Sequence, residues 1–175
     1  MQQSPVLQFQ QESKSEYFMS SDHKYNFQKK VDEKKIAKAC RHNAPISVKY
    51  ATEFGNYFKN MPINKAIKIA TDIEAKKDYL PLVKYAKKVP NRKGISKRGT
   101  TTGRYPVKCA KYVREMLEEV KANAENKNLD ADKLKIVSMF AVKGVTRSKL
   151  QPMGRIGGKS RESKSTNLEV VVVEE

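Results

Sequence analysis

The chain has 175 residues, and its 36 Lys and Arg against 19 Asp and Glu leave a net charge of +17 at pH 7. An excess of this size points to a polyanionic partner rather than to an ordinary enzyme surface. No run of about 18 apolar residues exists, which excludes a transmembrane helix, and residues 1–9 lack the features of a secretory signal. Cys40 and Cys109 are isolated, which favours a reducing compartment over a disulfide scaffold.

The excess charge falls in two runs. Residues 79–114 contain eleven basic residues and no acidic one, and residues 143–164 contain seven basic residues against Glu162 alone. A single charge run is most often a solvated tail, but two runs inside the folded part of a chain favour contact with nucleic acid.

The first half of the chain predicts one strand and two helices. Residues 1–43 are polar without a sustained period and predict an extension that is loose in isolation. Apolar alternation over residues 46–50 predicts a short strand, followed by a short helix over 53–59. Asn60 as cap and Pro62 in the first turn predict a helix to about residue 77. Its apolar face comprises Ile63, Ala66, Ile67, Ala70 and Ile73.

The second half predicts a basic loop, a long helix and two strands. Pro90, Gly94, Gly99 and Gly103 interrupt any regular element and predict the loop. The helix, over residues 106–126, carries an apolar stripe of Cys109, Val113, Met116, Leu117, Val120 and Ala124. We expect Cys109 to be a small core residue. Residues 134–142 and 168–173 alternate as strands, the first with Leu134, Ile136, Ser138, Phe140 and Val142 on one face.

The 24 residues 143–166 between these strands are rich in Gly, Ser and basic residues. A structureless loop of this length is uncommon and is either functional or disordered. Alternatively, the strands continue outward as a hairpin arm, which would need an external surface such as RNA to hold it. The elements predict an α+β fold: three helices on a small antiparallel three-stranded sheet, which a hairpin over residues 143–166 would extend as a long basic β-hairpin arm. Residues 1–43 would be the extension and 44–175 the domain, with a basic insert at 84–104 and the arm at 143–166.

Patterns that would indicate an enzyme are incomplete. The segment 154–160 (GRIGGKS) has one residue too few for a phosphate-binding loop, and a strand rather than a helix follows it. Cys40 and His42 lie two positions apart, but no second pair completes four metal ligands. The basic runs contain almost no carboxylate that could serve as a catalytic base. The sequence therefore predicts no catalytic site, no metal and no cofactor.

Several segments and the order of the predicted elements resemble those of one universal large-subunit ribosomal protein family. Its bacterial member is numbered L twenty-two, and its eukaryotic member is of the L seventeen type. The resemblance covers about residues 24–174, and residues 1–23 have no counterpart. It is most specific at the entry to the long helix. The matching segments are 60–66 (NMPINKA), 103–108 (GRYPVK), 122–125 (ANAE), 129–130 (LD), 154–156 (GRI) and 167–170 (NLEV).

The resemblance implies a structural constituent of the large ribosomal subunit, in the cytoplasm and with nucleolar assembly in a eukaryote. Its partners would be large-subunit rRNA, neighbouring ribosomal proteins and the nascent polypeptide in the exit tunnel, with no membrane or small-molecule substrate. The expected RNA-binding residues are Lys84, Lys87, Lys88, Arg92, Lys93, Lys97, Arg98, Arg104, Lys108, Lys111, Arg147, Lys149, Arg155, Lys159, Arg161 and Lys164. The expected tunnel-facing tip of the arm is Gln151, Pro152, Met153, Gly154, Arg155, Ile156, Gly157 and Gly158. The alternative is a free-standing basic RNA- or DNA-binding protein outside the ribosome.

Overall fold

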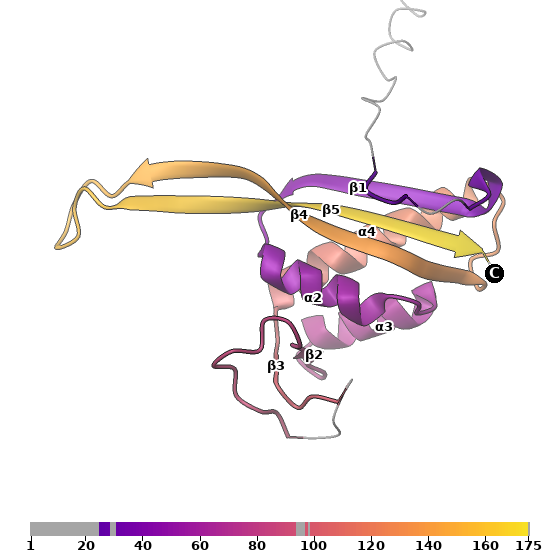
Figure 1. Cartoon of the computed structure of the whole chain (residues 1–175), viewed down its shortest axis with the longest axis horizontal. Coiled ribbons are helices and arrows are strands. Elements are labelled where there is room, and N and C mark those ends of the chain that lie inside the picture. The colour runs from indigo at the N-terminus through magenta and orange to yellow at the C-terminus, as the bar shows by residue number, and fades with distance from the viewer. Residues whose placement is uncertain (1–24, 29–30, 94–96, 98, 175) are drawn as a thin grey trace, which may run out of the picture.

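The computed structural model describes residues 25–28, 31–93, 97 and 99–174, in which one three-stranded antiparallel sheet lies on three helices (Figure 1). The strand order is β1–β5–β4, and the hairpin of β4 and β5 extends far beyond the helices. This arrangement confirms the predicted α+β fold with its long arm. The elements are η1 (Glu33–Lys35), β1 (Ile36–Ala44), α2 (Val48–Phe58), α3 (Ile63–Glu74), β2 (Leu80–Pro81), β3 (Gly103–Arg104), α4 (Val107–Glu125), β4 (Leu134–Leu150) and β5 (Ser160–Glu174).

The first strand of the sheet differs from the prediction. Strand β1 pairs antiparallel with β5, from Ile36 opposite Val173 to Ala44 opposite Thr166. The sheet therefore begins at Ile36, on the N-terminal side of residue 44, which is the predicted start of the domain. The strand predicted over residues 46–50 is wrong, because Ser47 is the N-cap of α2 and the chain is already helical at Val48. Five alternating residues are too few to distinguish a strand from the first turn of a helix.

The predicted apolar faces of α3 and α4 form most of the core. On α3, Ile63, Ala66, Ala70 and Ile73 are fully buried, whereas Ile67 is only partly buried. Every member of the predicted α4 stripe is buried, Cys109 included. The expected cap of α3 is wrong: Pro62 occupies the N-cap position, while Asn60 takes a positive φ of 62° and donates its N–H to the Ile136 carbonyl at 2.8 Å.

Strand β4 changes the face it presents to the core at a bulge. Ile136 pairs with Val172, but Ser138 pairs with Val171, so one extra residue sits on β4. Because side chains alternate along a strand, one inserted residue moves all later ones to the opposite face. Met139 is consequently buried, and Phe140 is 44% exposed. The single uninterrupted alternation predicted over residues 134–142 is therefore wrong after residue 136.

The central strand β5 is covered on both faces. Leu168, Val170 and Val172 belong to the main core, which lies against the helices. Val171 and Val173 pack with Ile36 in a second cluster, which also includes Tyr25, Phe27 and Val31. Part of the expected N-terminal extension thus packs on the outer face of the sheet. Burial there, with Cys40 and Glu169 nearby, raises the pKa of Tyr25 to about 12.

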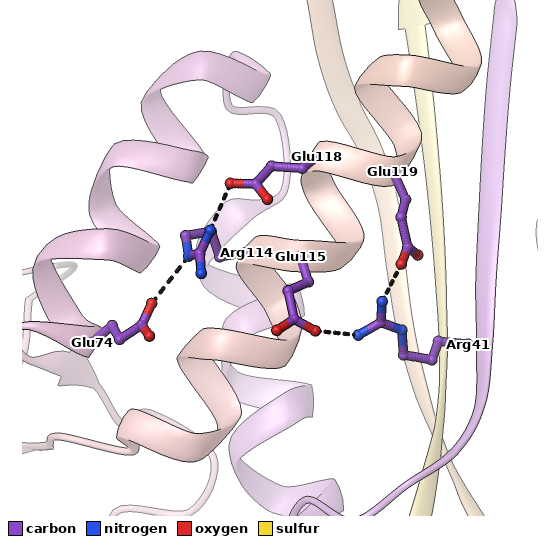
Figure 2. Close-up of polar contacts among 6 residues, drawn as sticks. All are labelled: Arg41, Glu74, Arg114, Glu115, Glu118 and Glu119. Atoms are coloured by element: carbon purple, nitrogen blue, oxygen red, sulfur yellow. Dashed lines mark hydrogen bonds and ion pairs between the residues drawn. The ribbon is translucent and has the colours of Figure 1, made fainter.

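Two arginines join α4 to its neighbours (Figure 2). Arg41 of β1 donates to Glu115 at 2.7 Å and to Glu119, and Arg114 bridges Glu74 of α3 at 3.0 Å and Glu118 at 2.8 Å. Burial opposes the charge of Arg41, but its hydrogen bonds with Glu115 and Glu119 outweigh burial and raise its pKa. Three carboxylates of α4 are therefore paired within the fold, whereas Lys108 and Lys111 in its first half are exposed without an ion pair to any described residue.

Candidate nucleic-acid interface

The segment 143–166, here called the arm, is built from the outer parts of β4 and β5. Its strands pair from Lys143 opposite Thr166 to Leu150 opposite Ser160. Of the two interpretations that the sequence left open, the continuous hairpin is the correct one. The arm projects away from the helices (Figure 1), and its outer residues are exposed. Backbone pairing holds the two strands together, but the projecting part has no core against which to pack.

A polar clamp fixes the base of the arm. The Asn43 side-chain oxygen accepts hydrogen bonds from the Val145 N–H at 3.2 Å and the Ser165 hydroxyl at 3.1 Å. The Asn167 side-chain oxygen accepts the N–H of Asn43 at 2.8 Å. Gly144 leaves room for these groups, because a Cβ there would lie 2.6 Å from Ser165 Oγ and 2.9 Å from each asparagine oxygen. The clamp lies beside a second irregularity of the hairpin, between Lys143 and Thr146.

The register of the arm separates its charges by face. Arg147 pairs with Ser163, and Lys149 pairs with Arg161, while Ser148 pairs with Glu162. Residues opposite each other on neighbouring strands share a face, and successive residues alternate. Arg147, Lys149 and Arg161 therefore share one face without an acidic neighbour. Lys164 shares the opposite face with Glu162, to which its ammonium lies 3.5 Å away.

The tip of the arm is a turn organised by Gln151. Its backbone carbonyl accepts the N–H of Gly158 at 2.9 Å, and its side-chain oxygen accepts Nε of Arg161 at 2.7 Å. Gly154 and Gly158 adopt φ values of 93° and 76°, in the left-handed region that favours glycine. Met153 is 80% exposed at this turn. The result is a narrow tip that presents exposed apolar side chains, those of Met153 and Ile156.

The basic insert is a loop held by a short ladder and by one buried carboxylate. The strands β2 and β3 close its ends, and the Arg92 guanidinium donates to the Gly103 carbonyl at 2.8 Å. The Glu53 side chain of α2 is 1% exposed and accepts the N–H groups of Val83 at 3.3 Å and Tyr85 at 2.7 Å. Backbone contacts thus fix the path of the loop while most of its lysines remain in solvent.

The predicted RNA-binding residues lie in different environments. Arg92 turns inward and stacks on Tyr105 with 5.0 Å between the guanidinium carbon and the ring centroid, and Lys97 pairs with Asp78. The Lys164 ammonium lies 3.5 Å from Glu162, and Arg98 lies outside the residues that the structure describes. The others are exposed and make no ion pair within the described chain: Lys84, Lys87, Lys88, Lys93, Arg104, Lys108, Lys111, Arg147, Lys149, Arg155, Lys159 and Arg161.

The thiol, histidine and carboxylate groups offer little chemistry beyond charge. Burial raises the pKa of Cys109 to about 12, so this thiol stays protonated and inert at neutral pH. Cys40 Sγ lies 3.6 Å from the Nε2 of His42. The described part of the chain holds no group of three or more potential metal ligands, and none of its helices is long and apolar enough to cross a membrane.

Sequence reasoning missed two kinds of residue. Glu53 and Asn43 hold the loop and the arm, but their roles depend on contacts between segments that are 30 or more residues apart. The predicted strand over residues 46–50 contains Lys49, but this residue lies in the first turn of α2, close to the arm base. A helix start at Ser47, an N-cap residue type, is the local signal that could have identified it.

Comparisons with known proteins agree with this architecture. The profile of the family described as ribosomal protein L22p/L17e matches residues 39–173. The large ribosomal subunit protein uL22 of Staphylothermus marinus is 38% identical over 82% of this chain and 92% of its own length. The uL22 proteins of Methanosphaera stadtmanae and Methanocaldococcus jannaschii are 35% and 37% identical, over 89% and 86% of this chain and 99% and 94% of their own lengths. The match begins inside β1 and ends inside β5, so it includes the sheet, the helices and the arm. Fold and sequence together show that this chain belongs to the ribosomal protein L22p/L17e family.

Proposed function

We propose that this chain is a structural, non-catalytic constituent of the large ribosomal subunit in the cytoplasm, where it binds large-subunit rRNA. The observation that carries the proposal is the arm: a hairpin with a basic face and no core, in a chain whose relatives are named large ribosomal subunit proteins. The projecting part of such an arm has nothing within the chain to pack against, so a surrounding surface would hold its position. A polyanionic surface would also relieve the repulsion among its cations.

Binding would rest on neutralisation of phosphates by lysines and arginines. The exposed cations of the basic insert and the first half of α4 form one region of contact, and the basic face of the arm forms the other. Arginines such as Arg147 and Arg161 add bidentate and stacking contacts, which lysine cannot make. RNA recognition of this type depends on the shape of the backbone and on unstacked bases rather than on reading a duplex groove.

The tip of the arm would line the nascent-peptide exit tunnel, next to neighbouring ribosomal proteins. Residues 151–158 are well suited to this position, because Gly154 and Gly158 keep the turn narrow where a peptide must pass. The exposed Met153 would face the peptide, since a flexible thioether tolerates many different side chains. The nascent polypeptide would then be a passing partner of the tip and not a substrate.

Sedimentation of tagged protein through a high-salt gradient tests the assignment. An integral constituent remains with the large subunit, whereas a free-standing nucleic-acid-binding protein dissociates and stays near the top. With isolated protein and rRNA in a filter-binding assay, the logarithm of the binding constant should fall against the logarithm of the salt concentration. The expected slope is about −0.7 per phosphate neutralised, or roughly −6 for about eight contacts on single strands. A flat salt response would contradict the electrostatic mechanism.

A further inference from the structure

A large hollow lies where the arm leaves the globular part of the chain. Its volume is about 940 Å³. Its wall combines the first turns of α2 and α4 with the arm base, represented by Lys143 and Lys164, and with Tyr85 of the basic insert. Four lysines line it: Lys49, Lys108, Lys143 and Lys164. We call it the arm-base hollow. Pockets that hold small molecules or single nucleotides fall in the range of roughly 300–1,000 Å³, so its size is sufficient for one nucleotide.

The charge of the arm-base hollow is almost entirely uncompensated. No carboxylate is among its lining residues. Within the described chain, Lys49, Lys108 and Lys143 form no ion pair, and Lys164 has only the exposed contact with Glu162 at 3.5 Å. The first turns of α2 and α4 add to this field, since neither contains an acidic residue or a side-chain cap. Unpaired positive charge around a concave surface favours a bound anion.

The hollow also offers an aromatic face. Tyr85 is half-buried, and its backbone N–H is fixed by Glu53 at 2.7 Å. The ammonium groups of Lys49 and Lys84 each lie 5.7 Å from the centroid of its ring. Exposed cation–π contacts are weak, so a base could replace a lysine on the ring at little cost. The displaced lysine would remain within reach of the phosphate of the same nucleotide.

We infer that the arm-base hollow binds one unstacked rRNA nucleotide, with its phosphate among Lys49, Lys108 and Lys143 and its base stacked on Tyr85. This inference rests on the proposed function and assigns a specific site to it. Lys49 and Lys143 would thereby join the RNA-binding residues, and the nucleotide would link the arm to the two helices. Single-stranded RNA is commonly held in this way, by a basic groove together with an aromatic platform.

The test compares two charge-matched double variants of the full chain for binding to transcribed large-subunit rRNA over a salt series. Lys49→Gln with Lys143→Gln removes two charges from the hollow, and Lys65→Gln with Lys68→Gln removes two exposed charges from α3. We expect the first pair to weaken binding about tenfold or more and to reduce the magnitude of the salt slope by up to about 0.7, the value for the one phosphate assigned to the hollow. The second pair should change affinity less than about threefold. Tyr85→Ala should weaken binding about tenfold and Tyr85→Phe should not, because only the former removes the stacking face.

The outcomes separate the site from the function. If wild-type protein binds rRNA with a steep salt slope but both double variants weaken it equally, the hollow is not the site and the proposed function remains. Equal binding by Tyr85→Ala and wild type would overturn the stacking of a base. Stronger competition by polyglutamate than by RNA would show an acidic protein segment as the occupant, against the inference. Absence of rRNA binding by wild type would overturn the proposed function and the site together.

Discussion

Replacement of Glu53 tests whether one buried carboxylate holds the basic insert. Glu53 lies on α2 with 1% of its surface exposed, and it accepts the backbone N–H groups of Val83 at 3.3 Å and Tyr85 at 2.7 Å. Glutamine at this position has nearly the same shape but only one carbonyl oxygen. It can therefore satisfy one of the two N–H groups, and through a neutral bond instead of a charged one.

The expected cost follows from these two bonds. Hydrogen bonds to charged groups contribute about 1.5–3 kcal/mol each and neutral ones about 0.5–1.5 kcal/mol. The longer hydrogen bond to Val83 belongs at the low end of the charged range. A neutral glutamine also recovers part of the lost free energy, because no charge has to be desolvated on burial. We expect Glu53→Gln to lower the free energy of unfolding by about 2 kcal/mol, and Glu53→Ala by about 3 kcal/mol because it also leaves a cavity.

Urea unfolding measures this global loss, and limited trypsin digestion at Lys84, Lys87 and Lys88 measures the local one. Cleavage at these lysines should be faster in Glu53→Gln, since the start of the loop has lost an anchor. Glu125→Gln is the matched control, because Glu125 is exposed at the end of α4 and its side chain forms no hydrogen bond or ion pair with the described chain. Unchanged stability together with an unchanged cleavage rate in Glu53→Gln would refute the role assigned to this carboxylate.

Four further predictions concern the core, the thiols and the arm. Val113→Asp should destabilise the fold by about 3 kcal/mol or more, because it buries an unpaired charge, whereas Lys111→Asp at an exposed site should mainly weaken RNA binding; equal thermal stabilities would contradict the packing of α4. Ellman's reagent at pH 8 should modify Cys40 in the native protein and Cys109 only after unfolding, and fast native reaction of both would contradict the burial of Cys109. Because the pKa of Cys109 rises from 9.0 unfolded to about 12 folded, the unfolded state loses its proton first, and urea unfolding should show stability falling as pH rises through this window. Gly144→Ala should broaden the distribution of distances between spin labels on the arm tip and on α3, with little change in melting temperature. An unchanged distribution would show that the clamp does not set the direction of the arm.

Elements with long, regular hydrophobic periods were predictable from the sequence. The stripe of α4 and the buried face of α3 repeat at helical spacing over several turns, so their burial follows from local pattern alone. The residue pattern of the arm left two alternatives open, because it contains Gly, Ser and cations without an apolar face, and the resemblance to the ribosomal family favoured the hairpin. Its strands are held by pairing with each other, which no period within either strand reveals.

The failures have specific physical causes. Strand β1 contains Ala37 and Ala39 where large residues would mark a strand, since α4 packs closely on that face. The bulge after Ile136 reverses the faces of β4, and an inserted residue has no sequence signature in an apolar strand. Among the site residues, charge composition identified the exposed cations. It could not show that Arg92 and Lys97 turn toward Tyr105 and Asp78.

The central claim is that this chain sits on large-subunit rRNA with its arm tip in the wall of the exit tunnel. A cryo-EM map of large subunits carrying the chain with residues 149–161 deleted tests it most directly, against a map of subunits carrying the full chain. We expect the globular domain to remain seated on rRNA at somewhat lower occupancy, and the tunnel beside it to be wider. An unchanged tunnel wall next to a fully occupied domain would contradict the tunnel assignment, and absence of the domain from full-chain subunits would contradict the ribosomal role itself.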